Sequence, residues 1–98
     1  MEFEWDEHKR LEVVRKHGVD LLVAALIFRG ETVSRVDNRR DYGEERLITT
    51  GLVNGTCFVV VHTERDGVTR LISAWRGGRR EQTRYQASIA RRTARDDG

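Results

Sequence analysis

The sequence lacks the features that mark disulfide-stabilised, membrane-spanning and secreted proteins. Cys57 is the only cysteine, so no disulfide can form within the chain. No apolar run approaches the roughly 20 residues that a helix needs to cross a bilayer, and Met1–Asp6 lacks the basic and apolar segments of a signal peptide. Proline is absent altogether, but this absence does not discriminate among folds. We therefore expect a cytoplasmic protein.

The chain of 98 residues is too short for two domains but long enough to bury one core. Apolar residues make up 38% of the chain and charged residues 35%. That balance is typical of a small soluble domain with a highly charged surface and is too apolar for a disordered chain. We expect a single domain over residues 1–98, with residues 95–98 frayed.

The formal net charge of +2 conceals an uneven distribution of charge. Residues 1–75 contain 11 Lys and Arg against 13 Asp and Glu, whereas residues 76–98 contain 7 Arg against 3 acidic residues. Arginine presents a planar set of donors that matches phosphate, so the basic C-terminal end favours a phosphate-bearing partner. A solvated helix face with no ligand explains the same charge equally well.

Hydrophobic periodicity and turn residues predict an α+β fold. The expected elements, in chain order, are a strand over 3–5, helices over 7–17 and 19–28, strands over 32–36, 46–53, 57–64 and 68–75, and a helix over 79–94. Asp6 and Asp20 are expected N-caps, Gly18 a left-handed helix end, and Asn54-Gly55 a hairpin turn. The short turns between strands indicate a small antiparallel sheet of about four to five strands, with two helices before it and one after it.

Two further expectations concern packing. The run Phe58–Val61 is apolar on both faces, so its strand should lie at the centre of the sheet. On the first helix, Leu11 and Val14 should point inward, while Lys9 and Lys16 remain mostly exposed.

The end of this central strand carries a histidine, a carboxylate and an arginine, namely His62, Glu64 and Arg65. His62 and Glu64 should share one face, because side chains alternate along a strand. His62 can transfer protons near neutral pH, Glu64 can orient it or act as a base, and Arg65 can hold a phosphate. The alternative is that His62 is a partly buried strand residue satisfied by a neighbour and that the other two are solvated.

The segment 76–81, which joins the last strand to the final helix, is a second candidate site. A helix N-terminus attracts anions, and Gly77-Gly78 would let the backbone approach a phosphate, although glycine pairs more often mark a simple turn. Tyr85, with Ile89 one turn later, is expected to dock this helix on the sheet.

Two further segments have structural explanations, and the usual metal-binding and nucleotide-binding motifs are absent from the sequence. Lys16-His17-Gly18 is explained as a helix C-terminus, and Trp5 as a core anchor rather than a stacking platform for a base. The three histidines lack the spacing of metal ligands, one cysteine cannot build a structural zinc site, and no phosphate-binding or dinucleotide motif is present. We expect neither a metal nor a cofactor.

Five segments, in this order and spacing, resemble the BrnT family of toxins over residues 3–86. They are Phe3-Glu4-Trp5-Asp6, Arg15 to Val19, Gly43 to Arg46, Val59 to Arg65, and Leu71 to Ala74 followed by Arg79-Arg80-Glu81. The resemblance implies a RelE-like fold and an endoribonuclease toxin of a type II toxin–antitoxin system, which cleaves RNA and arrests growth. It also implies a BrnA-like antitoxin, in a complex of two toxins and two antitoxins that binds promoter DNA through the antitoxin.

The resemblance further implies a metal-independent reaction in which the ribose 2′-OH attacks the adjacent phosphorus while arginines stabilise the charge. Carried over onto this sequence, the catalytic residues are His62 or Glu64 for proton transfer, with Arg79 and Arg80 as charge stabilisers. The RNA-binding residues are Lys9, Arg65, Arg76 and Tyr85.

The sequence departs from the family pattern at the end of the last strand. The family usually has Ile-Ser-x-Arg there, whereas this chain has Trp75 in place of the arginine; Gln82 also replaces a frequent arginine, and Gly77-Gly78 a less flexible pair. Arg76 would project to the opposite face of a regular strand. Loss of such a charge donor can cost about 3 kcal/mol of transition-state stabilisation. The alternative to an active toxin is therefore a catalytically weakened homologue that serves as an antitoxin-binding, autoregulatory or RNA-binding module.

Overall fold

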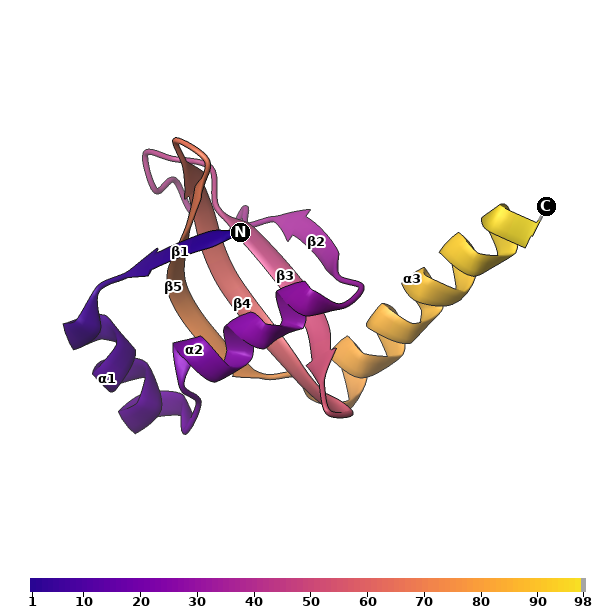
Figure 1. Cartoon of the computed structure of the whole chain (residues 1–98), viewed down its shortest axis with the longest axis horizontal. Coiled ribbons are helices and arrows are strands. Elements are labelled where there is room, and N and C mark those ends of the chain that lie inside the picture. Colours follow the sequence, from indigo (N-terminus) through magenta and orange to yellow (C-terminus); the bar gives the residue numbers. More distant parts are fainter. Residues whose placement is uncertain (98) are drawn as a thin grey trace.

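The computed structural model describes residues 1–97 and arranges five strands in one sheet (Figure 1). The elements are β1 (Glu2–Trp5), α1 (Glu7–His17), α2 (Leu21–Ala24), the 3-10 helix η1 (Ala25–Arg29), β2 (Val33–Val36), β3 (Leu47–Val53), β4 (Thr56–Arg65), β5 (Val68–Arg76) and α3 (Arg79–Asp97). The strand order β1-β5-β4-β3-β2 places β4 at the centre, as its two-sided apolar run predicts. The α+β class is confirmed.

Local signals fix most of the element boundaries. The Asp6 carboxylate accepts from the backbone N–H of Lys9 at 3.2 Å and begins α1, and Gly18, with φ +66°, ends it. Asn54 and Gly55 both have positive φ, as the tight turn between β3 and β4 requires. None of the helices in the described part of the chain has the length and hydrophobicity that crossing a bilayer requires.

The sheet is mixed, whereas the sequence predicted an antiparallel one. β1 pairs with β5 in parallel, with Phe3 opposite Thr69. Three helical segments separate β1 from the first hairpin, so no short turn dictates its direction. Instead, β1 is placed by packing, because the Phe3 ring lies 5.7 Å from the Phe28 ring of η1.

The two faces of the sheet differ in what covers them. One face, here called the helix-covered face, packs against α2 and η1, with α2 on β4 and β5 and η1 on β3 (Figure 1). Its buried cluster includes Leu21, Ile27, Phe58, Val60 and Leu71. The opposite face, here called the open face, has its own smaller apolar cluster. That cluster consists of Ile48, Val59, Val61 and Ile72, with Trp75 packed against it.

Helix α1 packs beside β5 with a different side inward from the one the sequence predicted. Leu11 and Val14 are 59% and 41% exposed, and Val13 is the buried residue of the helix. The guanidinium of Arg10 donates twice to the Asp20 carboxylate, at 2.9 and 2.8 Å, which fixes the rotation of α1 relative to the start of α2. The side of α1 that meets β5 therefore carries polar residues.

Helix α3 projects away from the sheet (Figure 1). The buried Tyr85 in its second turn docks it, as expected, and its contacts are with β2 and β3. The helix continues to Asp97, beyond the end near residue 94 and the fraying from residue 95 that the sequence predicted. Gly98, the last residue of that predicted fraying, lies outside the described residues.

Candidate functional site

His62 lies on the helix-covered face and is only 4% exposed. Its Nε2 is 2.7 Å from Oγ1 of Thr49, which in turn lies 2.6 Å from Oγ of Ser34. The Phe28 ring packs on the imidazole in a T-shaped arrangement, with 5.1 Å between ring centroids. His62 is thus part of a closed polar network beneath η1.

The second ring nitrogen of His62 faces Glu64, so the expectation that these residues share a face is confirmed. Nδ1 lies 3.4 Å from Oε1 of Glu64, yet among residues 1–97 it has no partner in hydrogen-bonding geometry. Burial lowers the pKa of His62 below 6.5, and the nearby carboxylate only partly offsets this effect. Both oxygens of Glu64 accept from the Thr69 hydroxyl, at 2.9 and 3.0 Å. A neutral, enclosed imidazole is suited to holding strands together.

Arg79 and Arg80 lie at the other end of β4 from His62. The N–H of Gly77 donates to the carbonyl oxygen of Cys57 at 3.0 Å, five residues along β4 from His62. At about 3.3 Å per residue, that is a separation of roughly 16 Å. Both arginines are exposed on a shallow surface of α3. The structure therefore does not bring His62 into one cleft with them.

The glycine pair before α3 is explained by packing. Gly77 donates its N–H to Cys57, and Gly78 donates its own to the Glu81 carboxylate at 3.0 Å, so neither amide points at a free anion site. Gly77 is buried, and a Cβ there would collide with Sγ of Cys57.

Arg76 and Tyr85 also lie apart from His62. Arg76 stands opposite Phe58 and Trp75 opposite Val59, so the two β5 residues point to opposite faces, as alternation predicts. Because it points to the other face, Arg76 cannot put a charge where Trp75 lies. The Tyr85 hydroxyl donates to the carbonyl oxygen of Glu31 at 2.9 Å, and burial raises the pKa of the phenol.

Lys9 and Arg65, the two other predicted RNA-binding residues, are brought together. They line one hollow, here called the basic groove, with Arg46 and Arg70; the other groups in it include the carboxylates of Asp6 and Glu44. Glu44 accepts from Arg65 at 2.7 Å and from Arg46 at 3.3 Å, and the Arg65 guanidinium is the main cause of the lowered pKa of that carboxyl. Arg70 also pairs with Glu4 at 3.5 Å, so four cations face three carboxylates and the groove stays positive.

A second hollow, here called the α1–β5 crevice, adjoins the basic groove and shares Lys9 and Ile72 with it. It is lined by Lys9, Glu12, Val13, Lys16, His17, Ile72 and Ser73. His17 is exposed, unlike His62, and the crevice places it with two lysines, a carboxylate and a hydroxyl. A phosphodiester in this crevice would meet two lysines and an exposed imidazole.

Of the crevice residues, Lys9 was predicted to bind RNA, but Lys16 and His17 were missed because the pair was explained as a helix end. That explanation is correct for the helix, since both residues lie in its last turn. A signal was nevertheless present, because Lys9, Val13 and Lys16 recur at the three-to-four-residue spacing of one helix face. That face is the one that meets β5.

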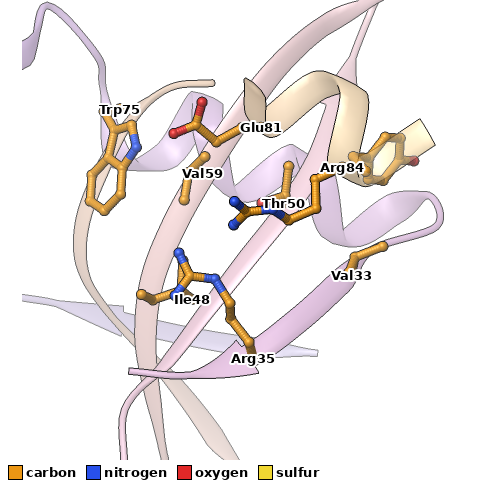
Figure 2. A pocket seen from close by; sticks show the side chains of 9 residues that line it. Val33, Arg35, Ile48, Thr50, Val59, Trp75, Glu81 and Arg84 are labelled. Atoms are coloured by element: carbon orange, nitrogen blue, oxygen red, sulfur yellow. The ribbon is translucent and has the colours of Figure 1, made fainter. Parts of the chain in front are cut away.

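A third hollow, here called the Trp75 pocket, continues along the open face. Its lining includes Trp75 from β5, Arg35 from β2 and Arg84 from α3, over a floor of Ile48, Thr50 and Val59 (Figure 2). The rings of His17 and Trp75 are 6.3 Å apart, which links this pocket to the crevice. Along β5, the three hollows extend from Arg70 to Trp75, roughly 16 Å at about 3.3 Å per residue.

The three hollows together form a cationic surface on the open face and along the edge of β5. Among residues 1–97, no three His, Cys, Asp or Glu side chains gather as a metal site requires. Around the basic groove, the crevice and the Trp75 pocket, lysines and arginines outnumber the carboxylates of Asp6, Glu12, Glu44 and Glu81. Such a surface suits a polyanion whose backbone runs along β5.

Comparison with known proteins agrees with this chemistry. No curated protein matches the sequence significantly. Residues 5–81 match the family described as the ribonuclease toxin, BrnT, of type II toxin–antitoxin systems, and this match covers most of the chain. With its α+β fold and cationic open face, the chain belongs to the BrnT family of ribonuclease toxins.

Proposed function

We propose that the chain is a metal-independent endoribonuclease that binds single-stranded RNA along the open face of its sheet. The observation that carries this proposal is the convergence of Lys9, Arg65 and Arg70 in one groove that leads directly to His17. These residues come from α1, β4 and β5, so only the folded chain assembles them. Family membership supports ribonuclease chemistry at such a surface.

In the proposed reaction, the ribose 2′-OH attacks the adjacent phosphorus and expels the 5′-oxygen of the next nucleotide. The products are a 2′,3′-cyclic phosphate and a 5′-hydroxyl. His17 accepts the proton of the attacking 2′-OH and gives it to the departing 5′-oxygen, while Lys9 and the groove arginines stabilise the charge that develops on the phosphoryl oxygens. Arg79 and Arg80 bind phosphates farther along the RNA, and His62 with Glu64 supports the strand ends.

A BrnA-like antitoxin neutralises the toxin in this proposal. Two toxins and two antitoxins form the complex, which binds its own promoter through the antitoxin. The family's assignment to type II toxin–antitoxin systems supports a protein partner and an RNA substrate. The reaction takes place in the cytoplasm, where cellular RNA is available.

One observation favours a second candidate function, that of a weakened toxin retained for antitoxin binding. Trp75 stands where the family pattern has an arginine, and Arg76 lies on the opposite face. The guanidinium of Arg39 is 5.7 Å from the Trp75 ring centre, but it is paired with the buried Asp37 carboxylate at 2.8 Å and does not replace that charge. We prefer the active enzyme because Lys9, Lys16 and His17 still converge in the crevice.

Inducible expression of the chain in a bacterial host tests the proposal. We expect growth arrest, relieved by the co-expressed antitoxin, and RNA fragments with 2′,3′-cyclic phosphate ends that the purified protein also produces in the presence of a chelator. The His17→Ala variant should be harmless, and Trp75→Arg should raise the cleavage rate. Harmless expression of the folded parent chain, with toxicity appearing only in Trp75→Arg, would establish the weakened toxin instead.

A further inference from the structure

The Trp75 pocket combines an aromatic wall with two arginine side chains that arrive from different elements. Figure 2 shows the indole of Trp75 on one side and the guanidinium groups of Arg35 and Arg84 directed into the hollow. The floor between them is formed by Ile48, Thr50 and Val59, two of which are buried in the open-face cluster. The pocket is therefore apolar at its base and cationic at its mouth.

The indole is held in place by two neighbouring side chains. Arg39 lies over the ring, with its guanidinium carbon 5.7 Å from the ring centre, and the His17 ring lies 6.3 Å away at 51°. Arg39 is itself held by the buried Asp37 carboxylate, to which it donates at 2.8 Å from both Nε and Nη2. A fixed aromatic surface loses little conformational entropy when a planar ligand stacks on it.

The two pocket arginines are available to a ligand. The ion pairs formed within residues 1–97 include neither Arg35 nor Arg84. Glu81, the one carboxylate that lines the pocket, accepts the N–H of Gly78 at the start of α3. The pocket therefore offers net positive charge beside a stacking surface.

This combination matches the chemistry of a nucleotide in single-stranded RNA. Unpaired bases stack on aromatic rings and on guanidinium planes, and the flanking phosphates are bound by arginine. An acidic peptide would use the two arginines but leave the indole and the apolar floor without a planar partner. The observations therefore favour a base over a carboxylate.

We propose that the Trp75 pocket binds one unpaired RNA base, which stacks on the indole while Arg35 and Arg84 hold the adjacent phosphates. This inference rests on the proposed function, because it deepens the definition of the substrate, but it concerns binding rather than cleavage. Trp75 is then a residue that determines where the RNA is positioned relative to the crevice, and the replacement of the family arginine becomes a gain of base recognition.

Fluorescence can test the proposal, because the chain has only two tryptophans. In a Trp5→Phe background, Trp75 is the single reporter. The probe is an eight-nucleotide 2′-O-methyl RNA, which binds but lacks the attacking hydroxyl. The control probe is the same single strand with abasic sugars. We expect the strand with bases to quench Trp75 and to bind about 5- to 150-fold more tightly than the abasic strand.

Variants at position 75 sharpen the test. Trp75→Leu should lose that 5- to 150-fold advantage of bases over abasic sugars, whereas Trp75→Phe should keep most of it. Trp5→Leu, at the tryptophan outside this pocket, should bind like the parent. Thermal unfolding of each variant verifies that the fold is intact.

Three outcomes would overturn the assignment: equal binding of the two strands, an undiminished preference in Trp75→Leu, or quenching by an acidic peptide but not by RNA. The proposed function has a separate readout, the cleavage of unmodified RNA. A chain that stacks bases on Trp75 but cleaves nothing would support this assignment and contradict the nuclease. Cleavage by Trp75→Leu with an unchanged KM would support the nuclease and contradict the assignment of the Trp75 pocket.

Discussion

On the helix-covered face, His62 is 4% exposed, bonded to Thr49 and packed against Phe28, whereas His17 is exposed in a crevice with Lys9 and Lys16. The two histidines are on opposite sides of the same layer of strands. Burial lowers the pKa of His62 and encloses it, so its contribution is to structure. Exposure among cations leaves His17 able to meet an anionic substrate.

The comparison teaches that proximity of a histidine and a carboxylate in sequence is a poor guide to catalysis. His62 and Glu64 are close in space as well, but His62 lines none of the three hollows along β5. What distinguishes the open face is the absence of α2 and η1, and the basic groove and the crevice lie there beside β5.

The largest expected effect is on catalysis at the open face. His17→Ala should reduce the rate of RNA cleavage by about 10²- to 10⁴-fold, the usual contribution of a general acid or base, with little change in melting temperature. His8→Ala, which removes another exposed histidine of α1, is the matched control and should cleave normally. If both variants cleave equally well, His17 is not the proton-transfer group.

On the helix-covered face, the expected effect is on stability. His62→Ala removes a buried ring and the partner of Thr49, so the free energy of unfolding should fall by about 2–4 kcal/mol. Chemical denaturation measures this loss. At a temperature where the variant is folded, its cleavage rate should stay within a few-fold of the parent; a 100-fold loss in the folded variant would restore His62 to the catalytic site.

The junction between the sheet and α3 allows a smaller test of packing. Gly77→Ala should cost about 1–3 kcal/mol of stability, because the added methyl group collides with Sγ of Cys57. At Gly78 the nearest obstacle is the end of the flexible Glu81 side chain, 3.3 Å away, so Gly78→Ala should cost less. Equal losses in thermal denaturation would contradict this account of the glycine pair.

The smallest effect is the pH dependence that His62 confers. Because burial lowers its pKa below 6.5, the unfolded chain binds this proton more readily than the folded one. Stability should therefore be complete above pH 6.5 and fall as the pH drops toward the folded pKa, by at most about 1.4 kcal/mol per unit.

Carboxylates with a lowered pKa, such as those of Asp20, Asp37 and Glu44, stabilise the fold while they are ionised. This contribution is lost only as the pH falls to their ordinary pKa values of 3.8 to 4.5 and below. Denaturant unfolding of the parent and of His62→Gln between pH 5 and 7 isolates the histidine. A parallel decline in both proteins would assign the pH dependence to other groups.

The elements were predictable because their signals are local. Capping by Asp6, the left-handed Gly18 and the Asn54-Gly55 turn depend on residues within one or two turns. The direction of β1 and the rotation of α1 could not be predicted, because they depend on distant contacts. Examples are the contacts of Phe3 with Phe28 and of Arg10 with Asp20. Periodicity in a single helix contains no information about such partners.

The candidate site was predictable only in part, for the same reason. Lys9 and Arg65 were identified and do line one groove. The burial of His62 depends on η1, which lies more than 30 residues earlier in the chain. The surroundings of Trp75 come from α1, β2 and α3, so no local motif predicts them.

The central claim is that RNA binds along β5 on the open face, and a comparison of paired charge removals tests it most directly. Lys9→Ala/Arg70→Ala removes two cations from the basic groove, and Arg29→Ala/Arg76→Ala removes two exposed cations that lie outside it. The measurement is the salt dependence of the affinity for the 2′-O-methyl strand. The account predicts that the first pair lowers the slope of log K against log salt by about 1.4, whereas the second leaves it unchanged. Equal changes in both, or a larger change in the second, would contradict it.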